Sequence, residues 1–513
     1  MEPVTLEAYR GLRPFYGDLH NHCGISYGHG SIEEAFANAR ERLDFCSVTG
    51  HAFWPDMPAP TPQTRHVVDY HRAGFDRLRR GWPDVVAATQ AANDEGRLVT
   101  FLSFEMHSMA DGDHTVVYRD GTGEVLYCDG LSGLARRVAD LRRRGVAVMA
   151  FPHHLGYPRG RRGVNWERFD TDLSPVVEIV SMHGCSESSE VPRPFLHSMG
   201  PSDHRSTMAF GLAAGKVFGV IGSTDHHSAH PGSYGHGLAA IWADDLTRAG
   251  LWDGLLARRT CALTGDRIAL QFALNGRAMG SRLGPCRARR VEVAVHAGGA
   301  IDCVDLVRNG RLIRRVSECD LPAPEAGPTI RTRLLLELGW GARGRRTDWD
   351  VLFGVSDGRI VEVEPRFRGG EIVSPTDRGA DAPSSNHYSH WEPAGPRAAR
   401  FRTITFGNPN NATRATQGLC LEADLPADAE VWAELNGRRV TVPLPRLLEG
   451  AAAGHLGGHG SAAYRFARAP LPGEFQWTLR LDDDDRPAAR DVYYVRVRQK
   501  NDQWAWSSPV FVG

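Results

Sequence analysis

Short apolar runs alternate with amphipathic stretches over the first 265 residues of the chain. The apolar runs predict buried β-strands at residues 43–49, 98–104, 146–151, 176–180 and 217–221. The stretches between them predict helices at residues 31–42, 67–78, 131–144 and 245–258. Ser31 followed by Glu34 is a capping box, which marks the start of the first helix. Buried strands that alternate with helices predict a parallel α/β arrangement.

After about Asp266 the pattern changes to alternating strands separated by turns. Three Asn-Gly pairs, at 275–276, 309–310 and 436–437, are flanked by apolar alternation and predict β-hairpins. Residues 492–498 predict a strand, and residues 504–512 are expected to return beside it. Loops are expected at 375–396 and 450–463. We therefore expect two domains, an α/β domain at residues 1–270 and a mostly antiparallel, β-sandwich-like domain at residues 271–513.

Composition narrows the class of protein. The chain has 513 residues, 42% of them hydrophobic and 24% charged, which is typical of a globular protein. The formal net charge of −1 gives no general attraction to nucleic acid or to an anionic membrane. No apolar run predicts a transmembrane helix, and residues 1–14 do not resemble a signal peptide. The nine cysteines form no C-x-x-C pair, so a reducing cytoplasm is the expected location.

Potential metal ligands follow the predicted strands, one group to each strand. His20 and His22 are two residues apart, so in an extended segment they face the same side. His114 is expected in a loop beyond Glu105. The remaining candidates are His51, Glu105, His153, His154, Glu178, His183, Asp225, His226 and His227. Side chains beyond the carboxyl ends of parallel strands converge on one site, and imidazole with carboxylate suits Zn, Mn or Fe.

Several of these residues lie in motifs that resemble those of the PHP (polymerase and histidinol phosphatase) superfamily. The motifs are residues 17–22 (GDLHNH), 47–51 (SVTGH), Glu105, 152–154 (PHH) and 222–227 (GSTDHH). They occur in order within residues 14–265. The β-rich remainder, including residues 505–509 (AWSSP), resembles a bacterial subgroup of unknown function. The resemblance implies a distorted (β/α)7 barrel and a metal-dependent hydrolase with up to three metal ions.

The resemblance also implies how the ligands are divided among the ions. The first ion would take His20, His22, Glu105 and Asp225. A second ion would share Glu105 as a bridge and would take His114 with either His153 or His154. A third ion would take His51 and His227, and His29 is the candidate for a further ligand. The family pattern usually has Asp before the histidine of the second motif, whereas this chain has Gly50, which puts the surroundings of the third ion in doubt.

Bridged divalent ions lower the pKa of a bound water and so supply hydroxide for hydrolysis. Glu105 is therefore expected to serve catalysis as the bridging carboxylate. His183, His226 or Asp18 would protonate the leaving group or orient a ligand, although Asp18 has the alternative role of anchoring its strand.

A loop rich in arginine and glycine follows the histidine pair. Arg159, Arg161 and Arg162, with Tyr157, are candidates for binding the substrate, because guanidinium groups recognise phosphate and carboxylate. The alternative is that these arginines are ordinary solvated charges on a surface loop.

We expect a hydrolase with two or three divalent metal ions (Zn, Mn or Fe) that acts on a small anionic molecule, most simply as a phosphoesterase. One alternative is hydrolysis of a C–O or C–N bond in a non-phosphate molecule, and another is a non-catalytic metal-binding protein. Neither nucleic acid nor a membrane is an expected partner. The β-rich part is expected to bind carbohydrate, to cover the barrel mouth or to form a homo-oligomer, and its fold does not decide among these.

Overall fold

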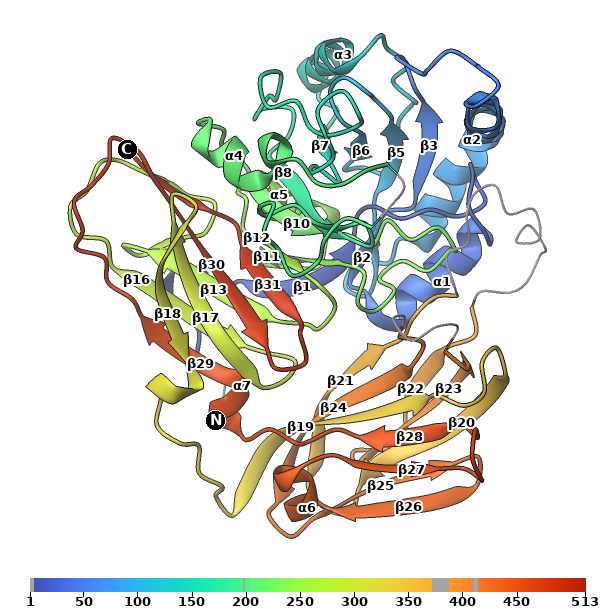
Figure 1. Cartoon of the computed structure of the whole chain (residues 1–513), viewed down its shortest axis with the longest axis vertical. Helices are drawn as coiled ribbons and strands as arrows, with labels where there is room; N and C mark the ends of the chain where they lie inside the picture. The colour runs from blue at the N-terminus through green and yellow to red at the C-terminus, as the bar shows by residue number, and fades with distance from the viewer. Residues whose placement is uncertain (1–3, 197–198, 371–386, 409–413) are drawn as a thin grey trace.

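The computed structural model describes residues 4–196, 199–370, 387–408 and 414–513. Figure 1 shows an α/β module at the top, a first β unit at the left and a second β unit at the bottom. The α/β module runs from β1 to β12. The first β unit comprises β13 to β18 with β29 to β32, and the second comprises β19 to β28. The second β unit is thus inserted into the chain of the first.

The α/β module contains all four helices that the sequence predicts. Its elements are β1 Arg13–Asp18, α1 Ile32–Arg42, β2 Phe45–Cys46, β3 Thr49–Phe53, α2 Arg65–Ala92, β4 Val99–Thr100, β5 Leu102–Met106, β6 His114–Tyr118, α3 Leu131–Arg143, β7 Val148–Pro152, β8 Val176–Ser181, β9 Gly184–Cys185, α4 Met208–Ala213, β10 Gly219–Gly222, β11 Leu238–Ala243, α5 Arg248–Leu256 and β12 Thr260–Leu263. The Ser31 and Glu34 capping box is present at the start of α1 and satisfies backbone donors there.

The strands of this module have mixed directions. Strands β1, β2 and β4 pair in parallel, as do β3 with β5 and β8 with β10. Strand β6 pairs antiparallel with both β5 and β7, and β11 pairs antiparallel with β1. The expected loop position of His114 is therefore wrong, because His114 begins β6. The module is mixed α/β, and within the described residues its strands belong to three separately hydrogen-bonded sheets, which do not by themselves show a (β/α)7 barrel.

The first β unit continues the sheet of the α/β module. Its elements are β13 Ala269–Leu274, β14 Arg277–Ala278, β15 Arg282–Leu283, β16 Val291–His296, β17 Ile301–Arg308, β18 Arg311–Ser317, α7 Pro472–Phe475, β29 Gln476–Arg480, β30 Asp491–Gln499, β31 Trp504–Ser507 and β32 Val510–Val512. Strand β31 pairs antiparallel with β12 and with β30, so hydrogen bonding crosses the expected boundary near residue 270. The division of the chain at that residue stays a prediction.

The second β unit is a sandwich of two antiparallel sheets around its own apolar core. Its elements are β19 Thr329–Gly339, β20 Arg346–Val355, β21 Arg359–Arg366, β22 His390–Pro393, β23 Ala398–Phe406, β24 Gln417–Pro426, β25 Glu430–Leu435, β26 Arg438–Pro443, α6 Leu444–Glu449, β27 Ala452–His455 and β28 Ala463–Phe466. Strands β22 and β27 lie in stretches expected to be loops. Both are short strands at sheet edges, where proline and glycine are tolerated and the sequence signal is weak. Residues 375–386 of the first of these stretches lie outside the described residues.

All three Asn-Gly pairs form the predicted hairpin turns. Asn275, Asn309 and Asn436 have φ values of 50°, 52° and 50°, and the glycine after each also has a positive φ. Two consecutive residues with positive φ are typical of the type I′ turn, whose twist matches that of the flanking strands. The turns join β13 to β14, β17 to β18 and β25 to β26.

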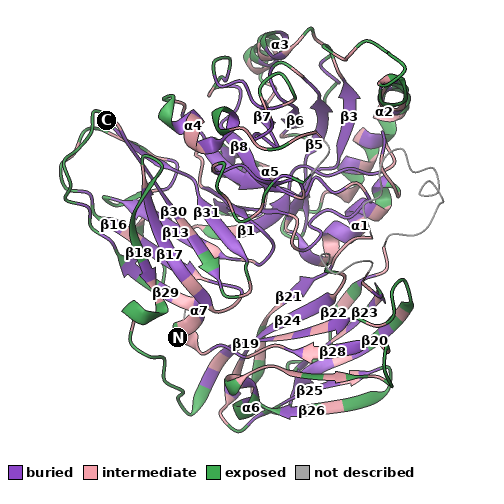
Figure 2. Cartoon of the chain, in the orientation of Figure 1, coloured by how far each residue is buried: buried purple, intermediate pink, exposed green. Residues whose placement is uncertain are grey.

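Buried residues are concentrated in the strands, and the outer helices are partly exposed. Figure 2 shows buried residues along the strands of all three parts, whereas α2 and α3 expose one side. One apolar core includes residues of both the α/β module and the first β unit, and these two parts also share a sheet. No helix within the described residues is long and apolar enough to cross a membrane.

Candidate metal centre

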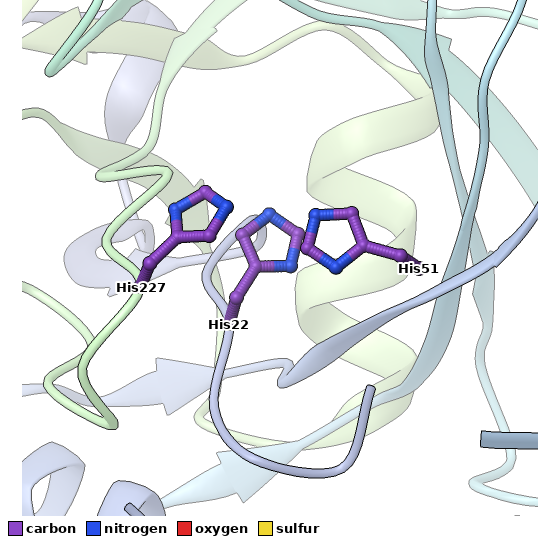
Figure 3. A group of neighbouring side chains, drawn as sticks. All are labelled: His22, His51 and His227. Carbon is purple, nitrogen blue, oxygen red and sulfur yellow. The ribbon is translucent and has the colours of Figure 1, made fainter. Parts of the chain in front are cut away.

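Among the described residues, four overlapping groups of histidine and carboxylate side chains lie together in the α/β module. Within each group the possible ligand atoms are within 4.8 Å of one another. The groups are His20, His22 and Asp225; His22, His51 and His227; His51, Glu105 and His107; and Glu105, Asp113, His153 and His154. Figure 3 shows the imidazole rings of the second group side by side, with ring centroids of His22 and His51 3.8 Å apart. Because neighbouring groups share His22, His51 or Glu105, they form one continuous cluster.

The ends of several strands bring these residues together. His20 and His22 follow β1, the histidine pair follows β7, and the segment with Asp225 and His227 follows β10. His51 in β3 is aligned with Glu105 in β5 across a pair of parallel strands. The structure thus brings candidate ligands from separate strands together, although the strands are not all parallel.

Glu105 lies at the centre of the cluster and is almost completely buried. Its Oε2 atom is 3.7, 3.6 and 3.5 Å from the Nε2 atoms of His20, His22 and His51. This oxygen accepts no hydrogen bond from the described residues. Its Oε1 atom is 3.2 Å from His153 Nε2 and 3.1 Å from His107 Nδ1. The two oxygens of one carboxylate therefore face two different sets of histidines.

These separations fit a metal site. Donor atoms about 2.1 Å from a common ion are about 3.0–3.5 Å apart in tetrahedral or octahedral coordination. Asp225 Oδ1 is 3.0 Å from His22 Nε2 and 3.5 Å from His20 Nε2. A buried carboxylate oxygen without a hydrogen-bond donor, surrounded by imidazole nitrogens at such distances, suits a divalent cation.

In five of the candidate histidines, Nδ1 contacts another group of the protein. His20 Nδ1 is 2.9 Å from Glu178, and His22 Nδ1 donates to the carbonyl of Thr49 at 2.7 Å. Three further Nδ1 contacts involve His51 with Ser26, His153 with Thr115, and His227 with the carbonyl of Asp225. Such contacts orient the imidazole so that Nε2 faces the cluster, which is the usual arrangement around metal-binding histidines.

Electrostatics favour the ligand forms of the central residues. Burial lowers the pKa of His51 and of His153 well below the usual range, which favours the uncharged ring that binds a metal. Burial acts to raise the pKa of Glu105, but the histidines around it, His107 first, hold that pKa well below its usual range. Burial also raises the pKa of Glu178, beside His20, to about 7.

The structure adds two residues that the sequence reasoning missed. His107 Nδ1 is 3.0 Å from Asp113 Oδ2, and both side chains belong to the cluster. His107 follows Glu105 by two residues, so the same spacing argument that linked His20 with His22 applies to it. Asp113 directly precedes His114, and no motif or spacing in the sequence marks it as a candidate ligand.

Some expected ligands are not in these groups. His114 Nδ1 donates to the carbonyl of Gly112 at 2.8 Å, and Asp113 takes part in the group instead. The backbone N–H of His29 donates to the carbonyl of His227 at 2.8 Å, so His29 lies beside the cluster without belonging to a group. Both histidines of the 153–154 pair are in one group, so the choice between them stays open.

Asp18 and His226 do not face the cluster in the way the sequence suggested. Asp18 accepts hydrogen bonds from the backbone N–H groups of His20, Thr224 and Gly232, which is the alternative anchoring role. The ring of His226 packs against Gly369 of the second β unit. His183 is close to the cluster: its Nε2 is 2.8 Å from Asp225 Oδ2, and its Nδ1 is 2.7 Å from the hydroxyl of Tyr157.

The three arginines of the loop after β7 differ in position. Arg162 Nε donates to Asp113 Oδ2 at 2.7 Å, and its Nη2 is 2.6 Å from His107 Nδ1. Its guanidinium also lies over the ring of Trp54. Arg159 is exposed and paired with Glu167, and Arg161 is exposed. Only Arg162 of the three therefore reaches the cluster.

Gly50 is explained by packing. A Cβ atom at this position would lie 2.4 Å from Leu78 Cδ1 on α2 and 3.3 Å from Ile25 Cδ1. Helix α2 thus occupies the space that the usual aspartate side chain would need. The ring of Tyr27 stacks on His51 with centroids 3.5 Å apart, so an aromatic residue is the neighbour of His51 here.

Comparison with known proteins gives limited matches. No family model matches the chain. An uncharacterized protein of Chlamydia pneumoniae is 29% identical over 167 residues, which cover 29% of this chain and 27% of that protein. An uncharacterized protein of Chlamydia muridarum is 27% identical over 165 residues, with the same two coverages of 29% and 27%. The chain thus matches about a quarter of the length of these curated relatives.

Among solved structures, the chain is similar to a two-domain protein of Bacteroides vulgatus that contains a predicted PHP-like metal-dependent phosphoesterase. The TM-score is 0.33 and the sequence identity is 12%. The match covers 86% of this chain and 98% of that one.

Proposed function

We propose that this chain is a metal-dependent hydrolase that binds two or three divalent ions, Zn, Mn or Fe, in the cluster around Glu105. The observation that carries the proposal is the position of the Glu105 carboxylate. One oxygen faces three imidazole nitrogens at 3.5–3.7 Å and the other faces two more at 3.1–3.2 Å. A carboxylate in this position is suited to bridge two ions. Two adjacent ions are typical of hydrolases that activate water.

The ions, when bound, would supply hydroxide at neutral pH and offset negative charge on the substrate oxygens. The protein itself would bind and orient the substrate. Arg162, held beside the cluster by Asp113, has a guanidinium suited to the non-reacting oxygens of a phosphate group. This charged donor at the cluster favours an anionic substrate, and a phosphoester above a neutral ester or amide.

Proton transfer to the leaving group is assigned in this proposal to His183 and Tyr157. Burial raises the pKa of Tyr157, so its phenol keeps its proton. The hydroxyl is hydrogen-bonded to His183, which is in turn bonded to Asp225. His183 is thereby oriented at the edge of the cluster and could deliver or accept a proton there. Asp18 and His226 contact other parts of the protein, and the proposal assigns them no part in proton transfer.

The same proposal extends to the family, fold, location and substrate of the protein. It includes membership of the PHP superfamily with a distorted seven-stranded barrel, a cytoplasmic location and a small anionic substrate. We do not propose nucleic acid as a partner. The β units are proposed as the surface through which a homo-oligomer would form. The alternatives are hydrolysis of a C–O or C–N bond and metal binding without catalysis.

The test is metal analysis of the purified full chain, followed by assays with phosphomonoesters, phosphodiesters, esters and amides after loading with Mn, Fe or Zn. We expect about two to three ions per chain and hydrolysis of a phosphoester. Less than about one ion per chain after loading with every metal would contradict the proposal. Hydrolysis of an ester or amide alone would support the alternative bond type, and full metal content without any activity would support the non-catalytic alternative.

A further inference from the structure

The segment that carries two candidate ligands is covered on one side by the second β unit. We call residues 223–237, between β10 and β11, the ligand loop. Its Tyr234 N–H donates to the carbonyl of Phe367 at 2.9 Å, and Arg368 Nη1 donates to the carbonyl of Tyr234 at 2.5 Å. The N–H of Gly369 donates to the hydroxyl of Ser233 at 3.1 Å. Residues 367–369, directly after β21, therefore bind the ligand loop at Ser233 and Tyr234.

His226 is the tightest point of this contact. It lies between Asp225 and His227 in sequence, and its ring is completely buried. A Cβ atom at Gly369 would lie 2.5 Å from His226 Cε1 and 2.7 Å from both His226 Nε2 and His230 Cβ. No side chain larger than hydrogen fits at residue 369 unless the histidine moves.

The other side of the ligand loop contacts the first pair of candidate ligands. The N–H of His22 donates to the carbonyl of His226 at 2.7 Å, and the N–H of Asp225 donates to the carbonyl of His20 at 2.8 Å. Asp225 also has a φ of 53°, which a non-glycine residue keeps only when its surroundings hold it. A shift of His226 would therefore displace the backbone on which His20, His22 and Asp225 are placed.

We infer that Gly369 and His226 are positioning residues of the metal centre, through which the second β unit holds the ligand loop in its binding geometry. This inference rests on the proposed metal binding. Neither residue contacts the ligand atoms of the cluster. Both act through the backbone of the ligand loop, in the way that residues behind metal ligands commonly do.

The test is Gly369→Ala in the full chain, with Gly458→Ala as the matched control. Gly458 lies in the same β unit, and a Cβ atom there would meet nothing within 4 Å. Metal affinity is measured by competition with a chelator, and the visible spectrum of the Co²⁺-loaded chain reports the coordination geometry. We expect Gly369→Ala to weaken binding by about 10–100-fold and to alter the spectrum. Gly458→Ala is expected to match the wild type in both.

A second variant covers the case in which Gly369→Ala does not fold. Ser233→Ala removes the acceptor of the Gly369 N–H and adds no volume. It is expected to weaken metal affinity in the same direction by a smaller factor, while the melting temperature of the metal-free protein stays close to that of the wild type.

The outcomes separate this inference from the proposed function. If the wild type binds no metal, the proposed function fails. If the wild type binds metal, and folded Gly369→Ala has unchanged affinity and Co²⁺ spectrum, the positioning role is wrong and the metal site stands. If Gly369→Ala does not fold, unchanged affinity and an unchanged spectrum in Ser233→Ala overturn the positioning role.

Discussion

Replacing Glu105 with Gln removes the central charge of the cluster while keeping the shape of the side chain. The amide retains one acceptor oxygen, so it can serve one of the two sets of histidines but cannot offset two cations. Loss of a ligand should cost more than the 10–100-fold typical of a residue behind a ligand. We therefore expect at least about 100-fold weaker binding of one ion, or about 2.7 kcal/mol, together with loss of hydrolysis.

The fold should survive this change. The contacts of Oε1 with His153 and His107 are of hydrogen-bond length, and an amide oxygen can replace that carboxylate oxygen. We expect the free energy of unfolding of the metal-free protein to change by less than about 3 kcal/mol. Metal content after dialysis, chelator competition and thermal unfolding measure the three quantities separately.

Glu178→Gln is the matched control. Glu178 is as deeply buried as Glu105 but contacts His20 Nδ1 rather than the Nε2 atoms at the centre. Its replacement should weaken metal binding by about 10–100-fold, which is less than the effect of Glu105→Gln. The bridging role would be refuted if Glu105→Gln kept the metal content and affinity of the wild type, or if Glu178→Gln had the larger effect.

Three further predictions concern the substrate, the metal and pH. Arg162→Ala should cost about 1–3 kcal/mol in kcat/KM for an anionic substrate, mainly through KM, whereas the exposed Arg159→Ala should not; equal effects of the two would count against the Arg162 assignment. Removal of metal by a chelator should lower Tm, and Mn or Zn should restore it, because an ion at 100 times its Kd adds about 2.7 kcal/mol; a Tm indifferent to metal would argue against a folded-state site. Burial acts to raise the pKa of Glu422, but hydrogen bonding with His296 and the charge of Arg333 lower it to about 2. Since this pKa is lower in the folded state than the unfolded value of about 4.3, the carboxylate stabilises the fold above that value, and about 3 kcal/mol should be lost as pH falls from about 5 to 2. Denaturant unfolding over this range should show that loss in the wild type and a flatter profile in Glu422→Gln; identical profiles would contradict it.

Elements with local signals were predicted well. The capping box at Ser31 begins α1, and the Asn-Gly turns join the strands expected of them, because each depends on a few adjacent residues. Strand β6 was missed because its signal is short and its pairing comes from β5 and β7 on either side. Strands β22 and β27 were missed for a similar reason, since each pairs on one side only.

The sequence predicted the types of ligand in the candidate site better than it predicted which individual residues belong to the site. Histidine and carboxylate after successive strands indicated a metal centre from the sequence. That Asp113 belongs to the cluster, and that Arg162 contacts the cluster whereas Arg159 does not, depended on the path of the loops that carry these residues. Arg162 has a φ of 71°, a backbone conformation that no pattern of apolar and polar residues indicates.

The sequence by itself determined the chemistry available to this protein and most of its local elements, because side-chain type and backbone preference are properties of short segments. Only the tertiary structure decided which ligands meet around Glu105, why Gly50 replaces a carboxylate, and that Gly369 of the second β unit packs on His226. Those contacts join residues far apart in the chain. Their distances follow from how sheets and helices pack, and packing is a property of the whole fold.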